Sequence, residues 1–198
     1  MGRHREFDID QALEAAMGVF WGQGYEGTSY DDLTRATGVK RPGLYAAFGN
    51  KEELFRRVLA RYTERHMGYM CAALRQPTSR QMVEGVLRGA AEITTRYPDH
   101  RGCLVLNGAL ACSAETRPIR ELLVDFRSQT ERALRERLEH FKQDHDLPPS
   151  ANCAGLAAYL TAVAHGMAVL AKAGVSNDVL DSVIEQTLAG WPPPPKPG

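Results

Sequence analysis

The chain has 198 residues, of which 43% are hydrophobic and 24% are charged, a balance typical of a soluble globular protein. Lysine and arginine together number 24, as do aspartate and glutamate, so the net charge of zero excludes a wholly basic nucleic-acid-coating protein but leaves room for a local phosphate-binding patch. Four cysteines without a CxxC pair favour reduced thiols in a cytoplasmic protein over a disulfide framework. We also expect neither a secretion signal nor a run of apolar residues close to the length of a membrane span.

The first part of the chain carries signals for two helices. Asp8 followed by Gln11 resembles a capping box, and apolar residues then recur at helical spacing until the chain reaches Gly24. Ser29, followed three residues later by an acidic residue, opens a second and shorter helix that stops at Gly38.

Residues 38–51, with the sequence GVKRPGLYAAFGNK, predict a turn followed by a short basic and aromatic helix. Gly38 can adopt positive φ between two helices, and Pro42 suits the first turn of the next helix, where a missing N–H costs nothing. Leu44 and Phe48 share one face, which holds the helix to its domain. The side chains that remain available to a partner are Lys40, Arg41 and Tyr45. This pattern indicates a DNA-reading element.

The rest of the chain also reads as helical. A helix begins at Lys51 and has no break signal until about Gln76, so it is long enough to belong to two structural units. The apolar segment 102–114 is interpreted as a buried helix, because no partner strand is visible elsewhere. Apolar periodicity predicts further helices over 78–97, 118–145, 150–173 and 177–188. We therefore predict an all-α protein of about nine helices with an extended or disordered proline-rich tail, residues 191–198.

Three segments occur in a specific order and spacing: GYEGTS at 24–29, DLTRATGV at 32–39 and KRPGLYAAFGNKEELF at 40–55. With them, the first roughly 62 residues resemble the DNA-binding domain of the TetR family of transcriptional regulators. The resemblance implies an N-terminal arm and a helix-turn-helix domain over 1–50 and a helical ligand-binding and dimerisation domain over 51–190. The helix that begins at residue 51 would link the two domains.

The resemblance implies contacts to double-stranded operator DNA. Arg41 would read a guanine edge, Tyr45 and Lys51 would hold phosphates, and the start of the second helix would contact phosphates through a hydroxyl and its N–H groups. The full expected set is Thr28, Ser29, Lys40, Arg41, Pro42, Gly43, Tyr45 and Lys51, with Arg3 and Arg5 of the basic arm. The alternatives are a half-buried packing role for Tyr45 and a solvated arm without a function.

The second domain is implied to bind a small-molecule effector and to form a homodimer. Soft apolar residues with a few polar ones suggest the pocket, for which plain core is the alternative: Met67, Met70, Cys71, Leu74, Leu104, Asn107, Leu110, Phe126 and His165. The two closing helices are rich in small and apolar residues, which favours an intersubunit contact. Its expected residues are Tyr159, Ala162, Gly166, Val169, Val179 and Val183.

The leading hypothesis is a dimeric transcriptional repressor that a small molecule releases from its operator, with no enzymatic activity, no cofactor and no membrane partner. One alternative is a thiol-based redox sensor on the same scaffold, using Cys71, Cys103 or Cys112. Another is an all-α binding protein or enzyme without DNA activity. No catalytic motif supports an enzyme, and a solvated helix end is favoured over a metal site for His140, Asp144 and His145.

Overall fold

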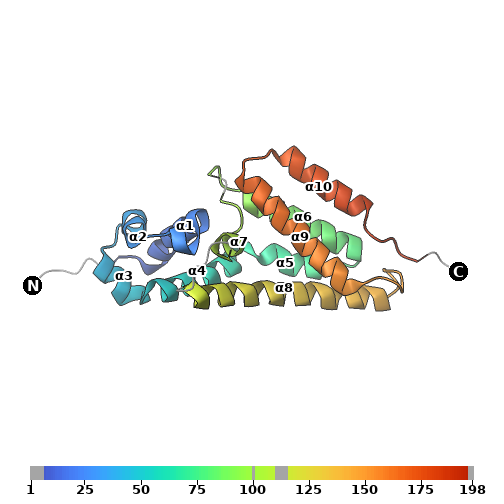
Figure 1. Cartoon of the computed structure of the whole chain (residues 1–198), viewed down its shortest axis with the longest axis horizontal. Helices are drawn as coiled ribbons and strands as arrows, with labels where there is room; N and C mark the ends of the chain where they lie inside the picture. The colour runs from blue at the N-terminus through green and yellow to red at the C-terminus, as the bar shows by residue number, and fades with distance from the viewer. Residues whose placement is uncertain (1–6, 100, 110–115, 196–198) are drawn as a thin grey trace, which may run out of the picture. The chain divides into compact units, whose positions relative to one another are not determined.

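The computed structural model describes residues 7–99, 101–109 and 116–195. Within these residues the chain forms ten helices and no strand (Figure 1), which confirms the all-α prediction. The helices divide into two compact units. The first contains residues 1–65 and 104–123, and the second contains residues 66–103 and 124–198.

The first unit is held together by an aromatic core. Phe20 and Phe55 meet edge to face with ring centroids 5.2 Å apart, and Trp21 and Tyr62 do the same at 4.8 Å. All four side chains are fully buried, where each contributes a large apolar area. The helices of this unit are α1 (Ile9–Gly27), α2 (Tyr30–Thr37), α3 (Arg41–Phe48), α4 (Lys51–His66) and α7 (Leu104–Ala109). Because α4 supplies Phe55 and Tyr62 to this core, the predicted domain boundary after residue 50 does not coincide with the boundary between the units.

Helix α1 begins where the sequence predicts it. The Asp8 carboxylate accepts hydrogen bonds from the backbone N–H groups of Asp10 and Gln11 at 2.9 and 3.0 Å. The helix kinks at Gly24, whose φ of +74° is not helical, and resumes as far as Gly27. A Cβ atom at Gly24 would lie 2.9 Å from the carbonyl oxygen of Asn107, so this glycine also lets α7 approach α1 closely.

Helix α2 is delimited by the predicted cap and glycine. The Ser29 Oγ accepts from the Asp32 N–H at 3.1 Å, while the Asp32 carboxylate accepts from the Ser29 N–H at 3.0 Å. The Ser29 hydroxyl also donates to the Asp32 carboxylate at 2.5 Å, and the hydrogen bonds that this carboxylate accepts from the Ser29 hydroxyl and N–H lower the pKa of Asp32. At the other end Gly38 has φ +70° and donates its N–H to the Thr34 carbonyl at 3.0 Å.

We expect Gly38→Ala to lower the free energy of unfolding by about 1–2 kcal/mol, because an L-residue pays that cost in the left-handed region. No atom lies within 4 Å of the position of a new Cβ, so the backbone conformation alone sets the effect. Gly38→Asn should cost less. The matched control is Gly22→Ala in α1. The new Cβ of this variant would also lie in open space, but the backbone there has a helical φ, so the substitution should be neutral or stabilising. Urea unfolding followed by circular dichroism measures all three; equal effects at both glycines would contradict the argument.

The predicted continuous helix from residue 51 to about 76 is wrong. The structure breaks it at Met67, which has φ −98° and ψ 8°, and a second helix, α5 (Gly68–Leu74), begins at the next residue. Gly68 is a poor residue for a helix interior, because glycine loses much backbone entropy there, and it suits the start of a new helix better. The Met67–Gly68 pair was therefore a break signal that the periodicity concealed.

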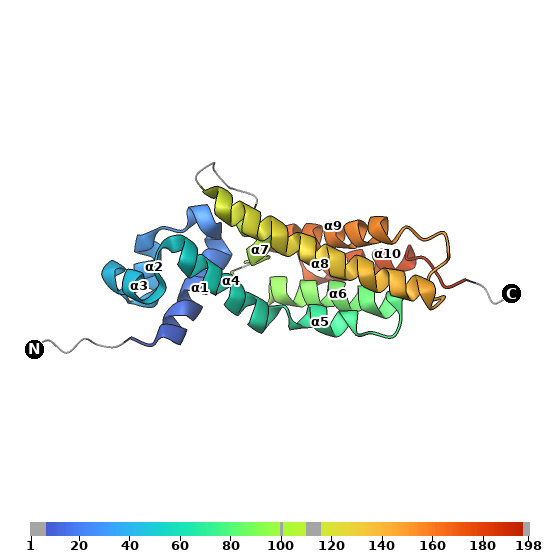
Figure 2. The ribbon, with the colours of Figure 1, turned by 90° about the horizontal axis from the view of Figure 1, so that it is seen from below.

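The second unit is a helical bundle whose helix α6 (Ser79–Thr95) packs against α5, α9 and α10 (Figure 2). Its other helices are α8 (Arg117–Gln143), which starts in the first unit, α9 (Cys153–Lys172) and α10 (Asn177–Ala189). The four helices predicted from apolar periodicity are confirmed, with small differences at their ends. The buried helix predicted within 102–114 is confirmed as α7, and residues 110–115 lie outside the described part of the chain.

The prediction for the tail is wrong at Trp191. This side chain is 5% exposed and belongs to the core of the second unit. Its indole N–H donates to the Ser79 hydroxyl at 3.2 Å, at the start of α6, and the neighbouring Arg80 donates to the Leu188 carbonyl at 2.6 Å. Residues 192–195, which follow, have no regular secondary structure. The chain is thus anchored by an aromatic residue before the proline run begins.

Helix α9 also corrects the expectation about long apolar segments. By length and composition alone it meets the criterion for a membrane-crossing helix, with a mean hydropathy of 1.6. Only 28% of that stretch is buried, and the buried residues, such as Leu160 and Met167, pack into the core of the second unit. The opposite side of the helix exposes Tyr159 and Val169.

Candidate nucleic-acid interface

The short helix α3 has one buried face and one exposed face, as the sequence predicts. Leu44 and Phe48 are each 1% exposed and fix the helix to the first unit. The exposed side chains are those of Lys40, Arg41, Pro42, Tyr45 and Ala46. Pro42 stands in the first turn, where its lack of an N–H is harmless. With α2 and the turn at Gly38, α3 forms a helix-turn-helix whose second helix presents a basic and aromatic surface.

Arg41 is the central side chain of that surface. Its guanidinium carbon lies 4.3 Å from the centroid of the Tyr30 ring and 5.6 Å from that of Tyr45. The hydrogen bond from Arg41 lowers the pKa of Tyr45, whereas burial raises the pKa of Tyr30 to about 12. Tyr45 is 42% exposed, and its contact with a phosphate stays a prediction. The prediction missed Tyr30, because no local pattern marks its approach to α3.

The two residues expected to contact phosphate at the start of α2 differ in exposure. Ser29 is exposed, and its hydroxyl caps the helix. Thr28 is 1% exposed, and its hydroxyl donates to the Gly24 carbonyl at 2.7 Å. The assignment of the Thr28 hydroxyl to a phosphate is therefore corrected: it closes the kink of α1, and any phosphate contact at Thr28 would have to use its backbone.

Lys51 stands at the first position of α4 and is half-buried. Its ammonium nitrogen lies 4.6 Å from the centroid of the Tyr25 ring, and burial lowers its pKa while the nearby Glu26 acts in the opposite direction. A capping box that the sequence-based prediction missed starts α4: Asn50 Oδ1 accepts from the Glu53 N–H at 2.9 Å, and Glu53 accepts from the Asn50 N–H at 2.8 Å. An N–x–x–E pattern was the available signal.

Gly43 has a structural reason to lack a side chain. A Cβ atom there would lie 2.9 Å from Val39 and 3.7 Å from the ring of Phe7. Only glycine therefore lets α3 lie this close to the side chains of Val39 and Phe7. Phe7 also contacts Phe48, with ring centroids 6.4 Å apart. The chain therefore enters the first unit beside α3. Arg3 and Arg5 of the predicted arm lie outside the described residues.

The residues predicted to line an effector pocket divide between the two units. Leu104 and Asn107 belong to the first unit, where the Asn107 amide donates to the Trp21 carbonyl at 2.8 Å. This role in joining α7 to α1 explains Asn107 without a ligand. The remaining residues lie in the second unit, except Leu110, which is not described: Met67, Met70, Cys71, Leu74, Phe126 and His165. Burial and the nearby Arg127 lower the pKa of His165.

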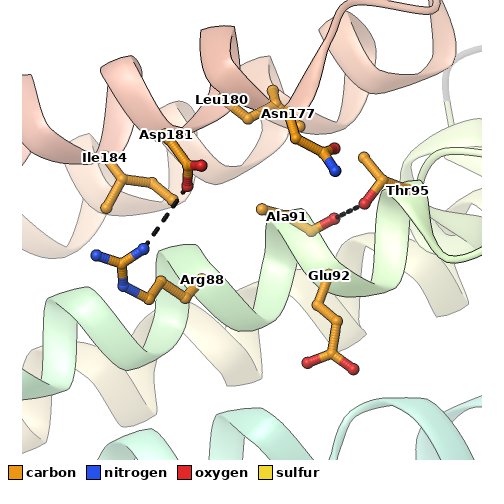
Figure 3. A pocket seen from close by; sticks show the side chains of 8 residues that line it. All are labelled: Arg88, Ala91, Glu92, Thr95, Asn177, Leu180, Asp181 and Ile184. Carbon is orange, nitrogen blue, oxygen red and sulfur yellow. Dashed lines mark hydrogen bonds and ion pairs between the residues drawn. The ribbon is translucent and has the colours of Figure 1, made fainter.

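A groove of about 270 Å³ lies between α6 and α10, and none of the predicted pocket residues lines it. Figure 3 shows Arg88 reaching from α6 toward Asp181 on α10, with Leu180 and Ile184 beside them. The guanidinium of Arg88 lies 3.6 Å from Asp181 and 2.9 Å from Glu84. Because two carboxylates already neutralise this arginine, we do not place an effector in the groove.

Most of the predicted dimer residues are exposed on α9 and α10. Tyr159, Val169 and Val179 are 48%, 53% and 44% exposed, which is unusual for large apolar side chains. Ala162 and Gly166 are exposed between them on α9, and Val183 is half-buried on α10. We call these six residues the α9–α10 face.

The fold and the basic surface define a helix-turn-helix DNA-binding protein, and comparison with known proteins agrees. The model for bacterial regulatory proteins of the tetR family matches residues 12–58, and that for the tetracyclin repressor-like C-terminal domain matches residues 80–187. This chain therefore belongs to the TetR family of transcriptional regulators.

Individual relatives span nearly the whole chain. It is 35% identical to the HTH-type transcriptional repressor ComR of Escherichia coli K12, over 96% of this chain and 92% of that protein. It is 30% identical to the repressor BdcR of the same organism, over 90% and 86%. Among solved structures, a cysteine mutant of the TetR family regulator CifR in complex with 26-base-pair operator DNA has 40% identity and a TM-score of 0.89, covering 96% of this chain and all of that one.

Proposed function

We propose that this protein is a dimeric transcriptional repressor that binds a double-stranded operator and leaves it when a small molecule binds the second unit. The observation that carries the proposal is the exposed Arg41 on α3, with Tyr45 one turn later and the capped α2 beside it. Relatives named as repressors, and a relative solved with operator DNA, support it. We also propose that it acts in the cytoplasm and carries no catalytic activity, in keeping with its family.

The proposed roles of the interface residues follow from their exposure. Arg41 reads a base edge in the major groove, since a guanidinium can donate two hydrogen bonds to guanine. Ser29, Lys40 and Tyr45 contact phosphates, and Lys51 does so from the start of α4, where the helix dipole favours an anion. At Pro42 and Gly43 the backbone of α3 approaches the DNA, and the arm with Arg3 and Arg5 adds phosphate contacts.

The regulatory part of the proposal concerns two further surfaces. The α9–α10 face joins two subunits, because its exposed apolar side chains would otherwise remain in water. The effector binds the residues of the second unit named above. If it binds more tightly to a conformation in which the two reading helices are differently spaced, this difference in binding free energy alone lowers the affinity for the operator.

We expect Arg41→Ala to weaken binding to the operator about 10- to 100-fold, because a bidentate arginine–guanine contact is worth about 1–3 kcal/mol. A duplex that the wild-type protein selects from random sequences is the probe, and fluorescence anisotropy measures the Kd. Arg132→Ala, which removes an exposed arginine from the second unit, is the control and should change little. Equal affinities for Arg41→Ala and wild type would contradict Arg41 as the reader, and a wild-type protein that selects no sequence would contradict DNA-binding function.

A further inference from the structure

The guanidinium of Arg41 is confined by aromatic rings from two different helices. Tyr30 is the first residue of α2, whereas Tyr45 lies on α3 itself. The two rings stack with centroids 5.0 Å apart and planes inclined by 21°. The Arg41 Nη2 donates to the Tyr45 hydroxyl at 3.4 Å, and its guanidinium carbon is closer to the Tyr30 ring than to the Tyr45 ring. We call these three residues the tyrosine–arginine cluster.

The two tyrosines do different work in this cluster. Tyr45 follows Arg41 by four residues on the same helix, so it moves together with Arg41 and cannot fix it relative to the rest of the domain. Tyr30 lies beside Ser29 at the capped end of α2, and its ring is half-buried while that of Tyr45 is exposed. Tyr30 is therefore the ring that ties the arginine side chain to a separate helix. The acidic Asp31, next in α2, adds a weaker attraction to the same cation.

We propose that Tyr30 is a positioning residue that determines the sequence specificity of Arg41. An unrestrained arginine side chain loses much rotamer freedom when it forms two hydrogen bonds to a base. Stacking on Tyr30 removes part of that freedom before DNA arrives and holds the guanidinium near the start of α3, from which major-groove readers extend. The inference rests on the proposed function.

The opposite possibility makes a contrary prediction. If Tyr30 held Arg41 away from the DNA, Arg41 would have to leave the ring before reading a base. Removing the ring would then strengthen operator binding, because Arg41 would no longer have a cation–π interaction to break before it reached the base. The sign of the change in affinity therefore distinguishes a ring that positions Arg41 for the base from a ring that holds Arg41 away from the DNA.

Tyr30→Leu is the informative variant, because leucine keeps an apolar side chain in this half-buried site but has no aromatic face for a cation. We expect its Kd for the wild-type-selected duplex to rise about fivefold, which corresponds to a cation–π contact of about 1 kcal/mol. Its Kd for a scrambled duplex and the salt dependence of binding should not change, since no phosphate contact is removed. Tyr30→Phe keeps the ring and should bind as wild type. Thermal unfolding confirms that all variants are folded.

A second measurement links the effect to Arg41 itself. In an Arg41→Ala background, Tyr30→Leu should cause no further loss, because contacting residues that act through one interaction are not additive. Repeated selection from random duplexes should show that Tyr30→Leu relaxes preference at the same base pair as Arg41→Ala. Additive losses, relaxation at other positions, or unchanged or tighter binding by Tyr30→Leu would each overturn the inference. If the wild-type protein selects no sequence, the proposed function itself fails. If the wild-type protein selects a sequence and Tyr30→Leu binds it with wild-type affinity, the positioning role fails but the proposed function does not.

Discussion

Placing a negative charge on the α9–α10 face, by Tyr159→Glu or Val169→Glu, is expected to convert the protein to monomers and to weaken operator binding by more than about 100-fold. Both side chains are about half exposed, at 48% and 53%, so a glutamate is tolerated in the isolated subunit. In a dimer the same charge is buried without a partner, which is costly. Two linked reading heads on sites one DNA turn apart gain about 10²–10⁴ in avidity over a single one, and the monomer forfeits that gain.

Size-exclusion chromatography with light scattering gives the oligomeric state, and anisotropy with the selected duplex gives the affinity. The chain offers a matched control in Val124→Glu on α8, since Val124 is also an exposed valine, at 38%, but lies outside the predicted face. The control should remain dimeric and bind as wild type. Dimeric Val169→Glu with normal affinity would show that the subunits meet elsewhere.

Trp191→Ala should lower the free energy of unfolding of the second unit by about 3–5 kcal/mol, the usual cost of removing a buried aromatic side chain. The indole is 5% exposed and bonded to the Ser79 hydroxyl, so truncation leaves a cavity between the end of α10 and the start of α6 and removes that hydrogen bond. The change is large relative to the roughly 5–15 kcal/mol by which domains are stable.

Urea unfolding followed by the circular dichroism of the helices measures this loss. Trp191→Phe keeps most of the apolar volume but cannot donate to Ser79, and should fall between wild type and alanine. Pro194→Ala, at an exposed position of the same tail, is the control and should be neutral. A loss below about 1 kcal/mol for Trp191→Ala would mean that the docked indole contributes no more than a surface residue.

Local signals in the sequence were sufficient for most of the helices. The Asp8 cap, the Ser29–Asp32 capping box and the left-handed Gly38 all involve groups within four residues of each other, so their consequences do not depend on the rest of the fold. One helix assignment was wrong, because continuous apolar spacing hid the break at Met67. The Asn50–Glu53 box was overlooked, but the predicted start of the helix at Lys51 is confirmed.

The candidate interface was only partly predictable. Arg41 and Tyr45 stand out because basic and aromatic residues lie away from the apolar face of one short helix, which periodicity alone reveals. Tyr30 comes from another helix, and its place beside Arg41 depends on how α2 and α3 cross. The burial of Thr28 depends likewise on the kink at Gly24.

The sequence by itself determined that this chain is an all-α member of the TetR family, and it predicted which short helix would read DNA, because caps, apolar spacing and the order of motifs are local properties. Only the tertiary structure decided which partner each of the key side chains has. It placed Tyr30 beneath Arg41, Lys51 against Tyr25 and Trp191 in the core of the second unit. These contacts join residues that are 11 to 112 positions apart in the sequence. They depend on how whole helices cross and pack, which no local sequence pattern specifies.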